Sequence, residues 1–306
     1  MLDDLRNGGK RALAEALVRI ETSLESPEVI RLLDAALFAP TGFSLGVTGP
    51  PGVGKSTLLN ALIHGWRAEG KTVAVIAVDP SSARTGGALL GDRTRLDTDP
   101  SDAGIFVRSM AARDMLGGVA EETFPAMVLM RALYDIVIVE TVGVGQSETD
   151  VSSVVDLTMF CAQPGSGDAL QYMKAGVMEV PDLIAVTKSD MGEVARRTAT
   201  DLKGSLGLNA DGIDSAVVLC SSANGDGIAE LMQGISDCAA QNSSRFDESR
   251  NAKLIRWSEA RISARFGSFG LSLVHRVCGQ SPPRFSFCEG NRRQLHLNEA
   301  FSEAFL

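Results

Sequence analysis

The chain has 306 residues, 44% of them hydrophobic, and a formal net charge of −9. This length and apolar content can bury a full globular core. The negative charge argues against a nucleic-acid groove or an anionic membrane surface as the main partner.

No apolar stretch reaches the roughly 18 residues that are needed to span a bilayer, and the acidic N-terminus lacks the apolar core of a signal peptide. The five cysteines are spread along the chain and form no Cys-x-x-Cys pair. This pattern is typical of reduced thiols in the cytosol. We therefore expect a cytoplasmic protein that has no membrane and no nucleic acid as partner.

Two helices are predicted before the first strand. Apolar residues recur at helical spacing over residues 13–20 and again over residues 29–37, directly after a Ser-Pro pair that is typical of a helix start. A Pro-Thr-Gly sequence then ends the second helix. We predict an N-terminal helical extension over residues 1–42.

A glycine-rich loop lies between an apolar run at residues 43–47 and a periodic apolar segment at residues 58–66. Such a loop turns backbone N–H groups and the positive end of the helix dipole toward one spot, which attracts phosphate. We expect Lys55 to reach the outer phosphates, Ser56 to bind a bridging Mg²⁺ ion, and Thr57 to lie near the inner phosphate. The predicted nucleotide-binding residues of this loop are Gly49, Pro50, Pro51, Gly52, Val53, Gly54, Lys55, Ser56 and Thr57.

A long polar stretch, residues 79–95, follows the buried strand that is predicted at residues 72–78. It begins at the carboxyl end of a parallel strand, where sheets of this kind bind their ligands. We interpret it as a mobile loop that responds to the nucleotide.

Another apolar strand, predicted at residues 136–139, ends in Glu140. A carboxylate at this position can hold the hydration shell of the magnesium ion, and Gly143 lets its backbone N–H approach the terminal phosphate. The next loop holds three polar residues that could position the attacking water, Gln146, Glu148 and Asp150. Our candidate among them is Gln146.

Further strands are predicted at residues 105–107, 157–160, 184–186 and 217–220, and helices at 117–133, from 169, and at 227–240. This alternation predicts a parallel sheet with helices on both faces. The fold class is α/β, a P-loop NTPase over residues 43–241 with N-terminal and C-terminal helical extensions. The C-terminal arm, residues 242–306, contains an amphipathic helix over residues 254–266. We expect this helix to bury its apolar face against the core or against the same helix of a second subunit in a dimer, and the tail of the arm has no predicted structure.

The segment Thr187-Lys188-Ser189-Asp190 follows the strand at residues 184–186. Asp190 can accept hydrogen bonds from N1–H and the exocyclic amine of guanine, while the stem of Lys188 lies along the ring. Ala223, flanked by Ser222 and Asn224, offers a backbone N–H to the base oxygen. Adenine lacks those donors, and a desolvated carboxylate without partners is costly. We therefore predict that GTP is preferred over ATP.

The order of these motifs resembles the GTPases associated with methylmalonyl-CoA mutase, a family also labelled as arginine/ornithine transport kinases. The likeness covers roughly residues 10 to 265, and its most specific part is the Glu-Thr-Val-Gly-Val-Gly-Gln-Ser-Glu run from residue 140. The other matching segments are residues 49–57, 78–82, 84–87, 90–93, 116–120, 167–168, 174–176, 178–179 and Asp182.

The resemblance implies a homodimeric GTPase that chaperones a cobalamin-dependent acyl-CoA mutase, gates the delivery of its cofactor and protects it. By position it implies catalytic roles for Lys55, Asp79, Glu140 and Gln146, and a magnesium site made by Ser56, Asp79, Asp92 and Glu140. Gly167, Asp168 and Lys174 match a switch that faces the partner. The sequence departs from the family at Thr187, where many relatives have Asn, at Asp114-Met115 and in the tail beyond about residue 279.

Two other functions remain open. A nickel-inserting GTPase is disfavoured by the scatter of the three histidines and the lack of a cysteine cluster. A kinase or ATPase linked to lysine, arginine or ornithine transport needs a second substrate pocket with a base, and no motif indicates one.

Overall fold

The computed structural model describes residues 1–80, 96–112, 121–141, 151–166, 181–206, 216–279, 281–282 and 284–304. The chain divides into two compact units. The sheet unit comprises Gly42–Ala120 and Tyr134–Ser243, and the helical unit comprises Met1–Thr41, Glu121–Leu133 and Ser244–Leu306. Six predicted site residues lie outside the described residues, as does the side chain of Asp79: they are Asp92, Gly143, Gln146, Gly167, Asp168 and Lys174.

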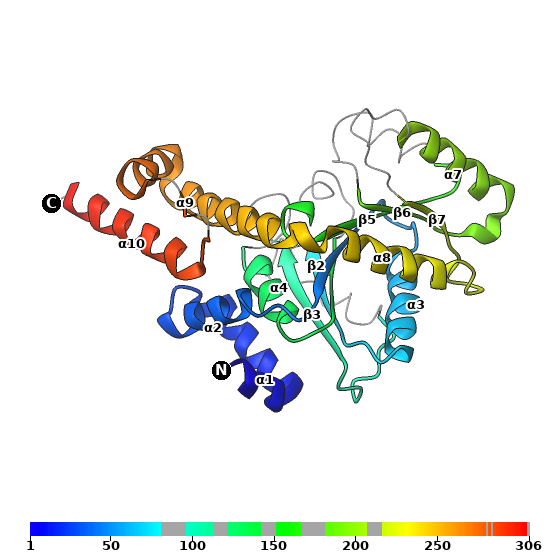
Figure 1. The fold of residues 1–306 in the computed structure, drawn as a ribbon, viewed down its shortest axis with the longest axis horizontal. Helices are drawn as coiled ribbons and strands as arrows, with labels where there is room; N and C mark the ends of the chain where they lie inside the picture. The colour runs from blue at the N-terminus through cyan, green and yellow to red at the C-terminus, as the bar shows by residue number, and fades with distance from the viewer. Residues whose placement is uncertain are drawn as a thin grey trace. The chain divides into compact units, whose positions relative to one another are not determined.

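The described part of the sheet unit contains seven strands, and every pairing between them is parallel (Figure 1). The strands are β1 (Phe43–Thr48), β2 (Val73–Pro80), β3 (Ile105–Ala112), β4 (Ile136–Glu140), β5 (Leu157–Ala162), β6 (Leu183–Val186) and β7 (Ala216–Leu219). Their order is β3-β2-β4-β1-β5-β6-β7. Strand β1 is central because it is a short apolar run that is buried on both faces. The predicted parallel α/β sheet is confirmed.

Helices cover both faces of this sheet, as predicted. They are α3 (Lys55–Ala68), α7 (Glu193–Leu206) and α8 (Ile228–Asn242), with short 3₁₀ turns η2 (Val151–Ser153) and η3 (Ser189–Met191). Ile184 and Val186 of β6 pack with Ala195 of α7, whereas Leu183 lies beside Gly234 of α8. Since neighbouring residues of a strand point to opposite faces, α7 and α8 lie on opposite sides. The sequence analysis did not identify α7.

The helical unit contains α1 (Leu2–Ser23), α2 (Pro27–Leu37), α4 (Thr123–Arg131), η4 (Ser243–Arg245), α9 (Phe246–Cys278) and α10 (Phe287–Ala304). Helix α2 starts as predicted, with Ser26 Oγ accepting a hydrogen bond from Val29 N at 3.3 Å. The Trp257 ring stacks on Phe124 and meets Phe287 edge-on, with centroids 5.7 and 5.3 Å apart. These rings join α4, α9 and α10, and α10 gives the C-terminal tail a structure that the sequence did not predict.

Among the helices that the structure describes, none is both long enough and apolar enough to cross a membrane. All five cysteines are free thiols. Cys161 and Cys220 are at most 1% exposed, and burial raises the pKa of each to about 12.

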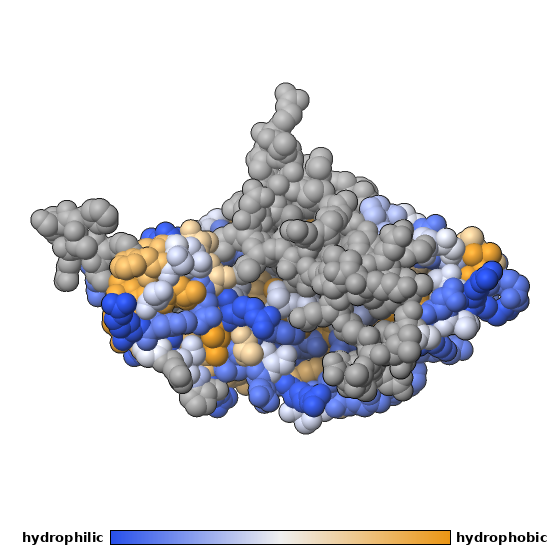
Figure 2. Space-filling model, turned by 90° about the horizontal axis from the view of Figure 1, so that it is seen from above, coloured by the Kyte–Doolittle hydropathy of each residue, from blue (hydrophilic) through white to orange (hydrophobic). Residues whose placement is uncertain are grey.

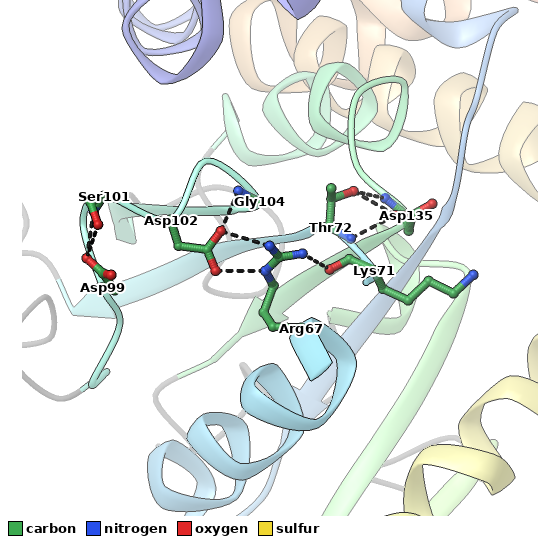
Figure 3. A network of polar contacts seen from close by, with 8 residues as sticks. All are labelled: Arg67, Lys71, Thr72, Asp99, Ser101, Asp102, Gly104 and Asp135. Carbon is green, nitrogen blue, oxygen red and sulfur yellow. Dashed lines mark hydrogen bonds and ion pairs between the residues drawn. The ribbon is translucent and has the colours of Figure 1, made fainter. Parts of the chain in front are cut away.

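A polar network ties the amino ends of β2, β3 and β4 (Figure 3). At the end of α3, Arg67 donates to both carboxylate oxygens of Asp102, at 2.9 Å from Nε and 2.8 Å from Nη2. Asp135 Oδ2 accepts from Thr72 N and Thr72 Oγ1 at 2.7 and 2.8 Å. Burial opposes ionisation of Asp135, but the hydrogen bonds from Thr72 and the positive charges of Lys71 and Arg67 together outweigh it and hold the pKa of its carboxyl below the usual value.

Candidate functional site

The predicted phosphate loop connects β1 to α3 at the carboxyl edge of the sheet. Its three glycines have positive φ angles, 142° at Gly49, 75° at Gly52 and 101° at Gly54, which other residues rarely adopt. A Cβ atom on Gly49 would also lie 2.4 Å from the carbonyl oxygen of Cys161. The loop therefore needs glycine both for its backbone angles and for its close approach to β5.

Lys55 is the first residue of α3, and only 8% of it is exposed. Its Nζ atom donates to the carbonyl oxygens of Gly49 at 2.6 Å and Pro50 at 3.1 Å. A buried ammonium needs such partners. The ammonium group of Lys55 therefore contacts the backbone of the loop. Pro51 and Gly52 of the same loop are exposed to solvent.

Two predicted magnesium ligands lie next to each other although they are far apart in the sequence. Ser56 Oγ donates to Glu140 Oε1 at 3.1 Å. Parallel pairing explains this proximity, since Glu140 at the end of β4 is opposite Val47, close to the end of β1. Asp79 belongs to the same edge, two residues beyond Ala77, which pairs with Glu140. Hard oxygen donors of this kind suit Mg²⁺.

Thr187 and Lys188 join the predicted base-binding segment to the phosphate loop. Thr187 Oγ1 lies 2.8 Å from the carbonyl oxygen of Val53 and 3.2 Å from that of Ala162. Lys188 has a left-handed backbone, with φ 53°, and its Nζ donates to the carbonyl oxygen of Gly52 at 2.9 Å. The hydroxyl of Thr187 therefore supports the phosphate loop.

Asp190 is exposed, and one of its oxygens accepts a hydrogen bond from Ser221 Oγ at 2.6 Å. Ser221 is 1% exposed, and its oxygen also accepts a long bond of 3.4 Å from the backbone N–H of Ala223. The sequence analysis placed Ser222 and Ala223 at the base but missed Ser221 as the partner of Asp190. A serine directly before that pair, at the end of a buried strand, was the available signal.

Ala223 and Asn224 lie on an exposed turn after β7. The Asn224 side chain closes this turn, because its Nδ2 donates to Asp226 Oδ2 at 2.6 Å and its Oδ1 accepts from Asp226 N at 3.2 Å. The structure thus brings together Lys55, Ser56 and Glu140 as one group, and Asp190, Ser221 and Ala223 as another, with Thr187 and Lys188 between them and the loop.

Comparison with known proteins identifies relatives over most of the chain. A family model described as methylmalonyl-CoA mutase-associated GTPase MeaB matches residues 13–267. GTPase ArgK of Escherichia coli is 39% identical over 264 residues, which are 83% of this chain and 80% of that protein. The mouse protein named methylmalonic aciduria type A homolog, mitochondrial, is 37% identical over 228 residues, 72% of this chain and 54% of the mouse protein.

Solved structures agree with the fold. A crystal structure titled LAO/AO transport system kinase has a TM-score of 0.67 and 28% identity, and the match covers 98% of this chain and 96% of that chain. HypB from Helicobacter pylori, in complex with nickel, has a TM-score of 0.50 and 17% identity over 72% of this chain and 97% of that chain. The likeness to HypB concerns the fold alone.

Proposed function

The chain belongs to the family of methylmalonyl-CoA mutase-associated GTPases, and we propose that it uses GTP hydrolysis with Mg²⁺ to gate a cobalamin-dependent acyl-CoA mutase. The observation that carries the nucleotide part is the group of Lys55 and Ser56 at the start of α3 and Glu140 at the end of β4, next to a glycine loop with positive φ angles. The mutase part is supported by the family description and by the mouse relative, which is named after methylmalonic aciduria.

In this proposal Lys55 exchanges its carbonyl partners for oxygens of the outer phosphates, where an ammonium gains a charge-to-charge attraction. Ser56 and Glu140 hold Mg²⁺, together with Asp79 and Asp92. When bound at these residues, the ion would supply positive charge that neutralises the phosphates. Gln146 is the candidate for orienting the water, and Gly143 for a backbone contact with the terminal phosphate.

In this proposal Asp190 gives the site its preference for guanine. Its exposed carboxylate accepts hydrogen bonds from the two donors of the guanine edge, while Ser221 holds it in place. The backbone N–H of Ala223 then faces the base oxygen, with Ser222 and Asn224 beside it. Calorimetry with GTP, GDP and ATP tests this: strong preference for the guanine nucleotides supports it, and equal affinity for ATP contradicts it.

We propose that the surface that binds a mutase includes the loops at residues 79–95, 140–150 and 164–174. These loops follow β2, β4 and β5 in the chain. Loops that contact the terminal phosphate and its metal are released when it leaves, which gives a partner two states to distinguish. Gly167, Asp168 and Lys174 are the candidates for contact with the partner. We also propose a cytoplasmic homodimer.

The test is to mix the protein with the methylmalonyl-CoA mutase of the same cell. Complex formation is measured with GDP and with a non-hydrolysable GTP analogue, and GTP turnover is measured with and without the mutase. By linkage, a mutase that prefers one nucleotide state must change nucleotide affinity in return. No binding in either state, with unchanged turnover, contradicts the chaperone function for this mutase.

The structure titled LAO/AO transport system kinase supports a kinase as the second candidate. A kinase transfers the terminal phosphate of labelled nucleotide to an acceptor, whereas a GTPase releases it to water. Label in free phosphate alone supports the GTPase gate, and label in a protein or small molecule supports the kinase.

A further inference from the structure

One thiol of the helical unit lies against an imidazole ring. Cys278 is the last residue of α9, and its Sγ atom lies 3.7 Å from Nδ1 of His296 in α10. The two residues are 18 positions apart in the sequence, and Figure 1 shows the orange end of α9 beside the red helix α10. A thiol and an imidazole in hydrogen-bond contact can pass a proton between them, which is the arrangement that activates a sulfur nucleophile.

Packing holds the two residues together but leaves their reactive atoms open. Val274, one helical turn before Cys278, and Leu297, next to His296, are both 2% exposed and belong to one apolar cluster with Ile262. Cys278 itself is half-buried and His296 is exposed. The buried neighbours therefore fix the backbone of both helices, while a small molecule can still reach the thiol.

The charges around Cys278 single out His296 as the activating group. The last carbonyl groups of α9 form the negative end of the helix and oppose a thiolate at its last residue. His275, one helical turn earlier, is engaged with Glu259, since its Nε2 lies 3.0 Å from Oε1 of that carboxylate. The contact with Nδ1 of His296 is thus the feature that favours removal of the thiol proton.

The other four thiols are poorer nucleophiles. Burial raises the pKa of Cys161 and Cys220 to about 12 and that of Cys238 to about 11, so these residues carry little thiolate near neutral pH. Cys288 is exposed, but its backbone N–H donates to Asp34 Oδ2 at 3.2 Å. A carboxylate beside this residue opposes a negative charge on its sulfur.

The surface next to the pair is partly apolar. Val277 is 62% exposed and Leu295 is 49% exposed, and each directly precedes one member of the pair. Figure 2 shows hydrophobic residues at the left of the view, where Figure 1 places the end of α9. Apolar side chains give the carbon skeleton of a small organic molecule a surface to lie on. This favours an organic disulfide over hydrogen peroxide as the reactant.

We propose that Cys278 and His296 form a site for thiol–disulfide exchange with small organic disulfides. Nδ1 of His296 takes the proton of the Cys278 thiol, and the thiolate attacks one sulfur of the disulfide. The S–S bond breaks, its electron pair leaves with the second sulfur, and the imidazolium returns the proton to that sulfur. The products are a mixed disulfide on Cys278 and one free small thiol, so the chain is oxidised as half of the reagent is reduced.

This site is separate from the nucleotide site. Both residues lie beyond residue 267, where the match to the family model ends. The exchange needs no nucleotide and does not depend on the proposed GTPase function.

Oxidised glutathione is the probe for the exchange. The full chain is incubated with it at pH 7, and mass spectrometry of the peptides gives the rate of adduct formation at each cysteine. Cys278 is expected to react about tenfold faster than Cys288. In urea the packing that holds the imidazole is lost, so the two rates should converge. Equal rates in the folded chain, or an advantage of Cys278 that persists in urea, overturn the proposal.

His296→Gln tests the imidazole itself. Glutamine is tolerated at this exposed position, so the melting temperature should stay the same while the rate at Cys278 falls about tenfold and the rate at Cys288 does not change. The matched control is His275→Gln, which removes the exposed imidazole one helical turn from Cys278 and should change its rate less than about twofold. An unchanged rate at Cys278 in His296→Gln, or an equal fall in His275→Gln, overturns the proposal.

Discussion

The two edges of the parallel sheet use similar polar residues in different ways. At the amino edge, Arg67 is paired with the Asp102 carboxylate through two hydrogen bonds. At the carboxyl edge, Lys55 is held by the neutral carbonyl groups of Gly49 and Pro50. A phosphate can replace a carbonyl group and gain attraction for the cation, but it gains little by replacing a carboxylate. The pair of Arg67 and Asp102 at the amino edge therefore suits a permanent contact, whereas the carbonyl contacts of Lys55 at the carboxyl edge are ones that a phosphate can replace.

The largest effect is expected from Lys55→Ala at the carboxyl edge. The variant removes the charge opposite the transferring phosphoryl group, so GTP turnover should fall about 100-fold or more. Steady-state phosphate release measures it. The melting temperature is the control, because a general loss of folding would also lower turnover. Turnover at the original rate would show that this loop is not the active site.

Asp190→Asn should lower GTP affinity about 10- to 100-fold, because it replaces a carboxylate that accepts from both guanine donors with an amide that accepts from one of them and turns its own N–H group toward the other. Xanthosine nucleotides offer an acceptor there, so they should bind this variant better. Ser221→Ala should cost only about fivefold, since it removes the hydrogen bond that orients Asp190. Calorimetry with guanosine and xanthosine nucleotides measures the affinities of both variants. A larger loss of GTP affinity in Ser221→Ala than in Asp190→Asn would contradict the assignment of Asp190 as the residue that binds the base.

Arg67→Ala tests the amino edge. It leaves the half-buried Asp102 carboxylate without its bidentate partner, so the free energy of unfolding should fall by about 2 kcal/mol. GTP turnover per folded molecule should stay within about twofold, because the change is at the opposite edge from the phosphate loop. Urea unfolding and phosphate release measure the two quantities. Lost turnover with unchanged stability would contradict the division between the edges.

The smallest effect concerns acid stability. The pKa of Asp135 is lower in the folded chain than its ordinary value of 3.8. The folded state therefore binds this proton less readily, and the stabilising contribution is full above about pH 4 and is lost as the pH falls through the lowered folded pKa. Asp135→Asn should flatten the acid side of a plot of unfolding free energy against pH. An unchanged acid side would show that Thr72 does not hold the carboxylate.

Local patterns in the sequence were enough for the framework of the sheet unit. Continuous apolar runs bounded by turn residues predicted all seven strands, although β3 is longer than expected and ends at Ala112 rather than Val107. The glycine spacing predicted the phosphate loop, because positive φ angles at Gly49, Gly52 and Gly54 are a local requirement. Parallel pairing then implied that Glu140 and Ser56 would lie at the same edge.

Tertiary structure decided the contacts between residues that are distant in the sequence. Nothing in the local pattern pairs Ser221 with Asp190, 31 residues earlier, or groups Glu121–Leu133 with the two ends of the chain. The apolar periodicity of α9 favours a straight helix, yet Gly267 interrupts it with a positive φ angle, and Ile262, Val274 and Leu297 form one apolar cluster. Periodicity reports which face of an element is apolar, but the partner of that face depends on how the whole chain packs.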